Sequence, residues 1–186
     1  PNIRIWAYGT GKYYAVNSLV NITQSVDKIA RETSIDEDLA LMFAEFKGRE
    51  ICIPPPPCVK GSDKPMDLLF VVDASTSLGS SNFREQITFL KRLLTHATIN
   101  REAVKVALIT YKGDPKLEFN FNKYLPGNIS AALDRLGAQT GGITEIRKAL
   151  VLAYEMLMNE NGTSGARGFS IPKVVIVLTD GYTRNG

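Results

Sequence analysis

The chain has 186 residues, which is enough for one α/β domain with a sizeable core. Its hydrophobic content of 44% and charged content of 22% are those of a globular protein rather than a disordered one. The net charge of +3 is too small to argue for nucleic-acid binding, and no basic stripe with interleaved aromatic residues is present. No apolar stretch approaches the roughly 20 residues that span a bilayer. No signal peptide is visible, so we expect a mature or excised segment.

The first third of the chain contains a helix signal and a proline-rich linker. Ser34-Ile35-Asp36-Glu37 forms a capping box, which predicts a helix that stops at Gly48. The prolines from Pro54 to Pro57 predict a stiff, extended linker between Cys52 and Cys58. This cysteine spacing is not that of a metal site, and in an oxidising compartment a disulfide is expected. Cys52 pairs either with Cys58 or with a cysteine outside the chain.

Strands and helices alternate from Met66 onward. Continuous apolar runs predict buried strands, and apolar residues at helical spacing predict amphipathic helices. Glycine-rich residues 159–172 predict a flexible loop. The expected elements are a parallel strand at 68–72, a helix at 83–95, a strand at 104–111, a half-buried edge strand at 117–121, a helix at 146–157 and a strand at 173–179.

Oxygen-bearing side chains follow the first of these strands in the sequence Asp73-Ala74-Ser75-Thr76-Ser77. One carboxylate and two hydroxyls would therefore lie at the carboxyl end of a strand, which is the edge where open α/β sheets bind ligands. Hard oxygen donors of this kind suit a divalent cation such as Mg²⁺.

Two later segments add further oxygen donors in loops. Thr140-Gly141-Gly142-Ile143-Thr144 precedes the helix at 146–157, where the glycines allow a close backbone approach and Thr144 offers a hydroxyl. The strand at 173–179 ends in Thr179-Asp180-Gly181, which adds a second carboxylate.

These three segments together resemble the von Willebrand factor A domain family. Its metal-ion-dependent adhesion site combines Asp-x-Ser-x-Ser, a Thr after paired glycines and the Asp of a Thr-Asp-Gly strand end. The resemblance implies a doubly wound, Rossmann-like α/β fold with a mostly parallel sheet, helices on both faces and one antiparallel edge strand. It also implies a site for Mg²⁺, or another divalent cation such as Ca²⁺ or Mn²⁺, in which some ligands act through water. The implied ligands are Asp73, Ser75, Ser77, Thr144 and Asp180.

The resemblance further implies that the family's final third stands at the front of this chain. Residues 3–11 resemble its late strand, residues 16–23 the short helix that follows, and residues 28–31 its last edge strand. We therefore expect the C-terminal portion of such a domain at 1–52, a linker at 53–65, and the N-terminal two-thirds of such a domain, with the metal site, at 66–186. The two portions span a junction of tandem domains, complete one sheet, or complete a neighbouring chain by a domain swap.

The implied function is recognition and not catalysis. A cation held mostly by hydroxyls stays electrophilic, so an incoming Glu or Asp carboxylate of a protein ligand gains a charge-assisted contact. His96 is the single histidine, which leaves little support for a serine or cysteine nucleophile. Similarity to matrilins, collagens that carry A domains and byssal thread matrix proteins implies a secreted matrix protein, with collagen as the first candidate ligand. A structural matrix spacer and a receptor ectodomain are the alternatives.

Other local features bear on the ligand and the compartment. Sequons at Asn21, Asn128 and Asn161 favour a secreted glycoprotein. Residues 159–172 lie where collagen-binding integrins carry an inserted helix, so collagen would have to bind through another surface or mode. Tyr182 follows the Asp-Gly pair where integrins often have an acidic residue. The loops that would set specificity are 78–82, 113–116, 139–143 and 181–184, with Lys112, Lys116 and Arg184 either attracting acidic partners or simply solvated.

Overall fold

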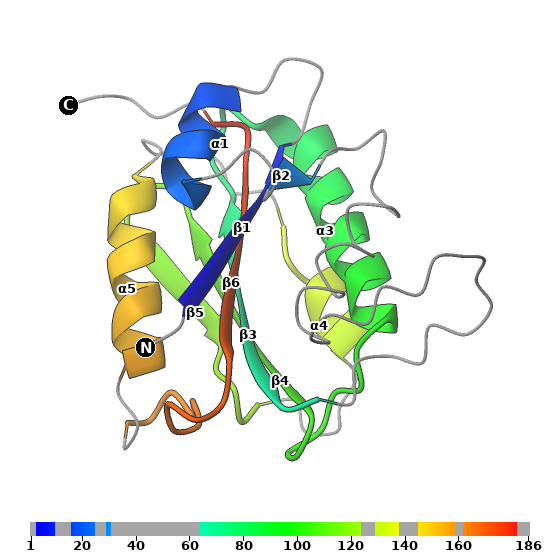
Figure 1. The fold of residues 1–186 in the computed structure, drawn as a ribbon. Coiled ribbons are helices and arrows are strands. Elements are labelled where there is room, and N and C mark those ends of the chain that lie inside the picture. The colour runs from blue at the N-terminus through cyan, green and yellow to red at the C-terminus, as the bar shows by residue number, and fades with distance from the viewer. Residues whose placement is uncertain are drawn as a thin grey trace, which may run out of the picture.

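The computed structural model describes residues 3–9, 16–24, 29–30, 64–123, 129–137, 145–158 and 162–181. The helix predicted after Ser34, both cysteines and the proline linker lie outside these residues. So do Thr144, Tyr182 and Arg184. The described segments form one sheet with helices on both faces (Figure 1).

The sheet has six strands in the order β2-β1-β6-β3-β4-β5. Neighbouring strands are parallel, except that β4 and β5 are antiparallel. The predicted fold class, a doubly wound and mostly parallel sheet with one antiparallel edge strand, is confirmed. The strands are β1 (Ile3–Gly9), β2 (Ile29–Ala30), β3 (Met66–Asp73), β4 (Val104–Tyr111), β5 (Pro115–Phe119) and β6 (Lys173–Thr179).

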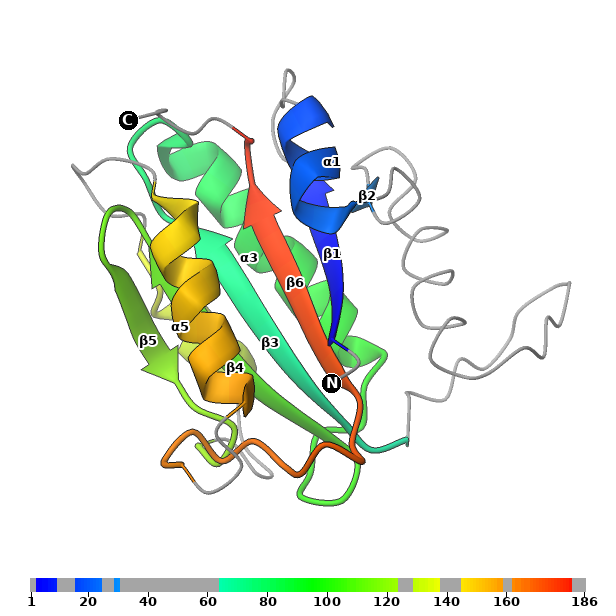
Figure 2. The same ribbon diagram turned by 60° about the vertical axis from the view of Figure 1, so that its left-hand side comes forward.

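Four helices are described, and they cover opposite faces of the sheet. α3 (Gly79–Thr95) and α4 (Ile129–Asp134) lie on one face, and α1 (Val16–Thr23) and α5 (Ile146–Met158) lie on the other (Figures 1 and 2). Helix α3 begins at Gly79 rather than at residue 83, because its first turn contains only glycine, serine and asparagine and so adds nothing to the apolar periodicity. None of the described helices is long and apolar enough to cross a membrane.

The central strands are buried on both sides because helices cover both faces. Along β3, Leu68 and Phe70 pack against the α3 side, whereas Leu69 and Val71 pack against the α5 side. All four are fully or almost fully buried. Burial of each such side chain stabilises the fold by about 1.5–3 kcal/mol. Because both faces of these strands are buried, their apolar runs are continuous and do not alternate with polar residues.

The edge strand β5 lies two residues earlier than predicted, at Pro115–Phe119 instead of 117–121. The alternation that we interpreted as strand continues to Phe121, but Phe121 is fully buried in the following loop, where its N–H donates to the Ser164 carbonyl at 3.0 Å. A register irregularity between Leu108 and Ile109 interrupts the pairing of β5 with β4.

Strand β1, near the start of the sequence, lies in the sheet beside β6, which is near its end. It pairs with β6 in parallel over its whole length, from Ile3 opposite Lys173 to Gly9 opposite Thr179 (Figure 2). The Tyr8 ring stacks on Phe89 of α3 with 4.1 Å between ring centroids. The division of the chain at residues 52 and 65 falls outside the described residues and stays a prediction.

A buried charge cluster fixes the amino-terminal ends of β3 and β6. The fully buried Asp67 carboxylate accepts hydrogen bonds from Lys173 Nζ at 2.6 Å, Arg167 Nε at 2.8 Å and the Arg167 N–H at 2.7 Å. The Arg167 guanidinium also donates to the carbonyls of Met66 and Ala103. The described part of the predicted glycine-rich loop is therefore anchored to two strands.

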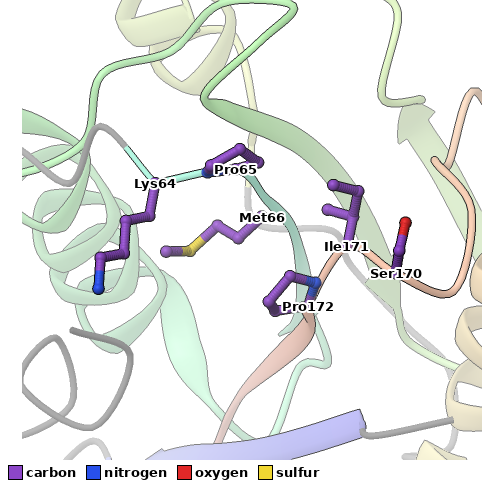
Figure 3. Close-up of a pocket in the computed structure, with 6 residues that line it drawn as sticks. All are labelled: Lys64, Pro65, Met66, Ser170, Ile171 and Pro172. Carbon is purple, nitrogen blue, oxygen red and sulfur yellow. The ribbon is translucent and has the colours of Figure 1, made fainter. Parts of the chain in front are cut away.

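A pocket of about 260 Å³ opens at the same edge (Figure 3). Two prolines, Met66 and Ile171 make its lining mostly apolar, and Lys64 is the one ionisable side chain among the described residues that line it. It lies at the end of β3 opposite Asp73, so it does not belong to the edge where the oxygen donors were predicted.

We predict that Asp67→Asn destabilises the fold by about 3–5 kcal/mol, because Lys173 is left buried without a carboxylate. Urea unfolding at neutral pH measures the effect. The matched control is Asp134→Asn, which removes an exposed ion pair with Lys91 and should cost less than about 1 kcal/mol. Equal losses in the two variants would contradict the structural role of the cluster.

Candidate metal centre

The oxygen donors predicted from the sequence come together where β3 and β6 end. These strands are neighbours and parallel, so their carboxyl ends share one edge of the sheet. Strand β4 continues to one side of β3 and β6 lies on the other, which makes this point the topological switch of the sheet. Asp73 is the last residue of β3, and Asp180 directly follows β6.

The Asp73 carboxylate is fully buried and surrounded by hydrogen-bond donors. Its Oδ1 accepts the Ser75 N–H at 2.8 Å, and its Oδ2 lies 3.3 Å from Thr179 Oγ1 and 3.4 Å from the Tyr111 hydroxyl. Burial raises the pKa of Asp73, and the charge of Asp180 adds to this, while hydrogen bonds from Ser75 and Thr179 act against it. No described cation forms an ion pair with Asp73, so its charge is not compensated by the protein side chains described.

The two serines of the motif form a hydroxyl pair. Ser75 Oγ and Ser77 Oγ are 2.9 Å apart. Ser75 is buried and Ser77 is exposed, so the pair runs from the carboxylate toward solvent. The turn that presents them leads directly into α3 at Gly79.

The end of β6 is shaped by a glycine. Gly181 has φ +78°, a left-handed conformation that L side chains rarely adopt. The Gly181 N–H donates to Thr179 Oγ1 at 3.1 Å. The same hydroxyl faces Asp73, so it links the two strand ends. Asp180, between Thr179 and Gly181, is buried.

Tyr111 is a residue of this site that sequence reasoning treated only as part of a strand. It is the last residue of β4, pairs in register with Asp73 and is almost fully buried. Its carbonyl accepts the Ala74 N–H at 2.9 Å. Burial, with the Asp73 charge as a second cause, raises the pKa of the Tyr111 hydroxyl well above its ordinary value, so the hydroxyl stays protonated and can donate. No signal in the sequence identifies it, because its role depends on which strand lies beside β3.

The structure thus brings four of the five predicted ligands to one sheet edge, and Thr144 lies outside the described residues, two positions before α5. Among the described residues, no group of three or more His, Cys, Asp and Glu side chains is placed to hold a metal ion. The donor set instead combines two buried carboxylates with hydroxyls, which suits a hard cation. A divalent cation would also compensate the two neighbouring negative charges.

Two lysines near this edge, Lys116 and Lys148, are paired with acidic groups. Lys116 Nζ lies 2.9 Å from Glu118, and Lys148 Nζ lies 2.9 Å from Asp114 and 2.8 Å from Glu145. These cations therefore add less positive charge to the rim than their number implies.

Known proteins share sequence or fold with this chain. The family model of the von Willebrand factor type A domain matches residues 67–186. Cuticlin-6 of Caenorhabditis elegans is 35% identical over 123 residues, which cover 66% of this chain and 20% of cuticlin-6. The human collagen alpha-5(VI) chain is 33% identical over 140 residues, which cover 74% of this chain and 5% of the collagen chain. The chain thus spans a fifth or less of these relatives.

A solved structure shares the fold. It is that of proximal thread matrix protein 1 from the mussel byssus with a zinc-occupied MIDAS (metal-ion-dependent adhesion site) motif. The TM-score is 0.53 at 21% identity, over 95% of this chain and 42% of that protein.

We predict that Asp180→Asn stabilises the metal-free protein by about 1 kcal/mol or less at pH 7, because it removes the like charge beside Asp73. Urea unfolding in chelator measures the gain. The pKa of Asp73 is raised in the folded state, so its ionisation costs stability as the pH rises above about 4. The gain should therefore vanish near pH 3, where Asp73 is protonated. A loss of stability at pH 7 would contradict repulsion between the two carboxylates.

Proposed function

This chain belongs to the von Willebrand factor type A domain family, and we propose that it is a metal-dependent protein-binding module of the extracellular matrix. The observation that carries the proposal is the sheet edge where Asp73 and Asp180 lie beside the Ser75–Ser77 hydroxyl pair. Two carboxylates buried on adjacent strand ends repel each other, and a cation bound between them would offset that repulsion.

Asp73, Ser75, Ser77, Thr144 and Asp180 would hold the ion, which is Mg²⁺ or another divalent cation such as Ca²⁺ or Mn²⁺. When bound, the ion supplies positive charge at an open edge of the sheet. The three hydroxyls are neutral, so the protein contributes few negative charges to the ion. An acidic side chain of a protein ligand can then complete the site with a charge-assisted contact.

The location and the partner are inferred from the relatives and the sequons. The relatives include a collagen chain, and the solved structure is of a protein named for the thread matrix. Asn21, one of the three sequon asparagines, is exposed on α1. These points support a secreted matrix glycoprotein, with collagen as the first ligand to test. Nothing in the described site offers a nucleophile with a histidine base, so we propose binding and not catalysis.

We also propose that residues 1–52 complete the metal-bearing sheet within the same chain. The support is the full-length parallel pairing of β1 with β6 and the stacking of Tyr8 on Phe89. A tandem neighbour or a swapped copy would supply the same strand from elsewhere, and the oligomeric state in solution distinguishes a swapped dimer from a monomer.

The metal site is tested first. Titration of the chain with Mn²⁺, followed by electron paramagnetic resonance of the free ion, should show one saturable site. Asp73→Ala should weaken binding by at least tenfold because it removes a ligand. The control Asp114→Ala changes an aspartate that is 89% exposed on the neighbouring β4–β5 turn and should bind within about twofold of wild type. Equal affinity in all three proteins would exclude a site at Asp73.

Ligand binding is tested on immobilised fibrillar collagen with Mg²⁺, with chelator and with Asp73→Ala. We expect binding that is lost both in chelator and in the variant, since the proposed contact passes through the metal edge. Binding that survives both conditions would move recognition to another face. No binding under any condition would favour a different ligand or a structural spacer.

A further inference from the structure

One oxygen of the Asp73 carboxylate lies between two buried hydroxyl groups. The Tyr111 hydroxyl is 3.4 Å from Oδ2 and Thr179 Oγ1 is 3.3 Å from it. Both distances exceed the roughly 2.7 Å optimum of a hydroxyl–carboxylate bond, so each contact is weak by itself. Together, the two donors nevertheless fix the direction in which Oδ2 points.

The acceptor positions of Asp73 can be counted. An ionised carboxylate has about four of them, two on each oxygen. The Ser75 N–H occupies one on Oδ1, and the Tyr111 and Thr179 hydroxyls occupy those on Oδ2. The Ser75 side chain also hydrogen-bonds the carboxylate, and Oδ1 is the oxygen that faces the Ser75 turn rather than the neighbouring strands.

We propose that Tyr111 and Thr179 are positioning residues, which fix the Asp73 carboxylate by Oδ2 and so present Oδ1 to the metal. This inference rests on the proposed function, because it assigns a role toward the ion that Asp73 would help to hold. Neither residue belongs to the five predicted ligands.

Both donors are held firmly by the backbone around them. Tyr111 is 1% exposed, pairs in register with Asp73 and accepts the Ala74 N–H through its own carbonyl. The Thr179 hydroxyl is fully buried and accepts the Gly181 N–H at 3.1 Å. A carboxylate fixed in this way loses less freedom when an ion binds than one that must first be ordered.

The competing explanation is packing alone. The Tyr111 ring belongs to the hydrophobic cluster under α5, so a large truncation would damage the core as well as the site. Tyr111→Phe keeps the ring and removes only the hydroxyl. Thr179→Val keeps the side-chain shape and removes the other hydroxyl, which also takes away the acceptor of the Gly181 N–H. These two changes separate positioning from packing.

The first measurement is the Mn²⁺ dissociation constant of the whole chain and of each variant. Tyr111→Phe and Thr179→Val should each bind about tenfold more weakly, as is typical when a group that orients a metal ligand is lost. The matched control is Tyr154→Phe, a tyrosine 56% exposed on the outer side of α5, which should stay within twofold of wild type. Urea unfolding in chelator checks that each variant is folded. If Tyr111→Phe does not fold, the test is made with Thr179→Val alone.

The second measurement needs no metal. The Ser75 N–H donates to Asp73 Oδ1, so its hydrogen exchange in chelator reports how firmly the carboxylate is held. We expect exchange to be several-fold faster in both variants and unchanged in Tyr154→Phe. Unchanged affinity and exchange in folded variants, with wild type binding Mn²⁺, would overturn the positioning role alone. A wild-type chain that binds no Mn²⁺ would overturn the proposed function itself.

Discussion

The alignment of β3 with β6 determines which side chains meet at the sheet edge where Asp73 and Asp180 lie. At one end of this strand pair, Asp67 lies opposite Lys173, and the two side chains form a buried ion pair of 2.6 Å. The pairing runs from there without interruption to Val72 opposite Leu178. A slip of one residue would reverse the faces of every side chain on one strand. The ion pair therefore helps to bring Asp73 beside Thr179 at the other end.

The sequence allowed prediction of the parts of the site that are local in the chain. Asp73 and Asp180 each follow an apolar run, so their place at a strand end could be predicted without knowledge of the neighbours. Tyr111 could not be predicted, because its role depends on which strand lies beside β3 and in what register. Asp67 and Arg167 are 100 residues apart, and no local pattern joins them. The start of α3 was missed because polar residues in a first turn carry no periodicity.

A site of this kind places affinity and stability in opposition. Asp73 and Asp180 are buried close together, and each makes the ionisation of a neighbouring carboxyl more costly when no cation is present. Hydroxyls and backbone N–H groups offset part of this cost for Asp73. The same low solvation that penalises the free carboxylates strengthens their attraction to an ion. Binding of a cation by these carboxylates should therefore stabilise the folded protein.

The edge strand β5 matters beyond the fold itself. A sheet edge presents unpaired backbone groups to which strands of other molecules can add. Strand β5 is short, begins with Pro115, and its pairing with β4 is irregular near Ile109. Its charged side chains, Lys116 and Glu118, form an ion pair at this edge. These features discourage edge-to-edge aggregation at this side of the sheet.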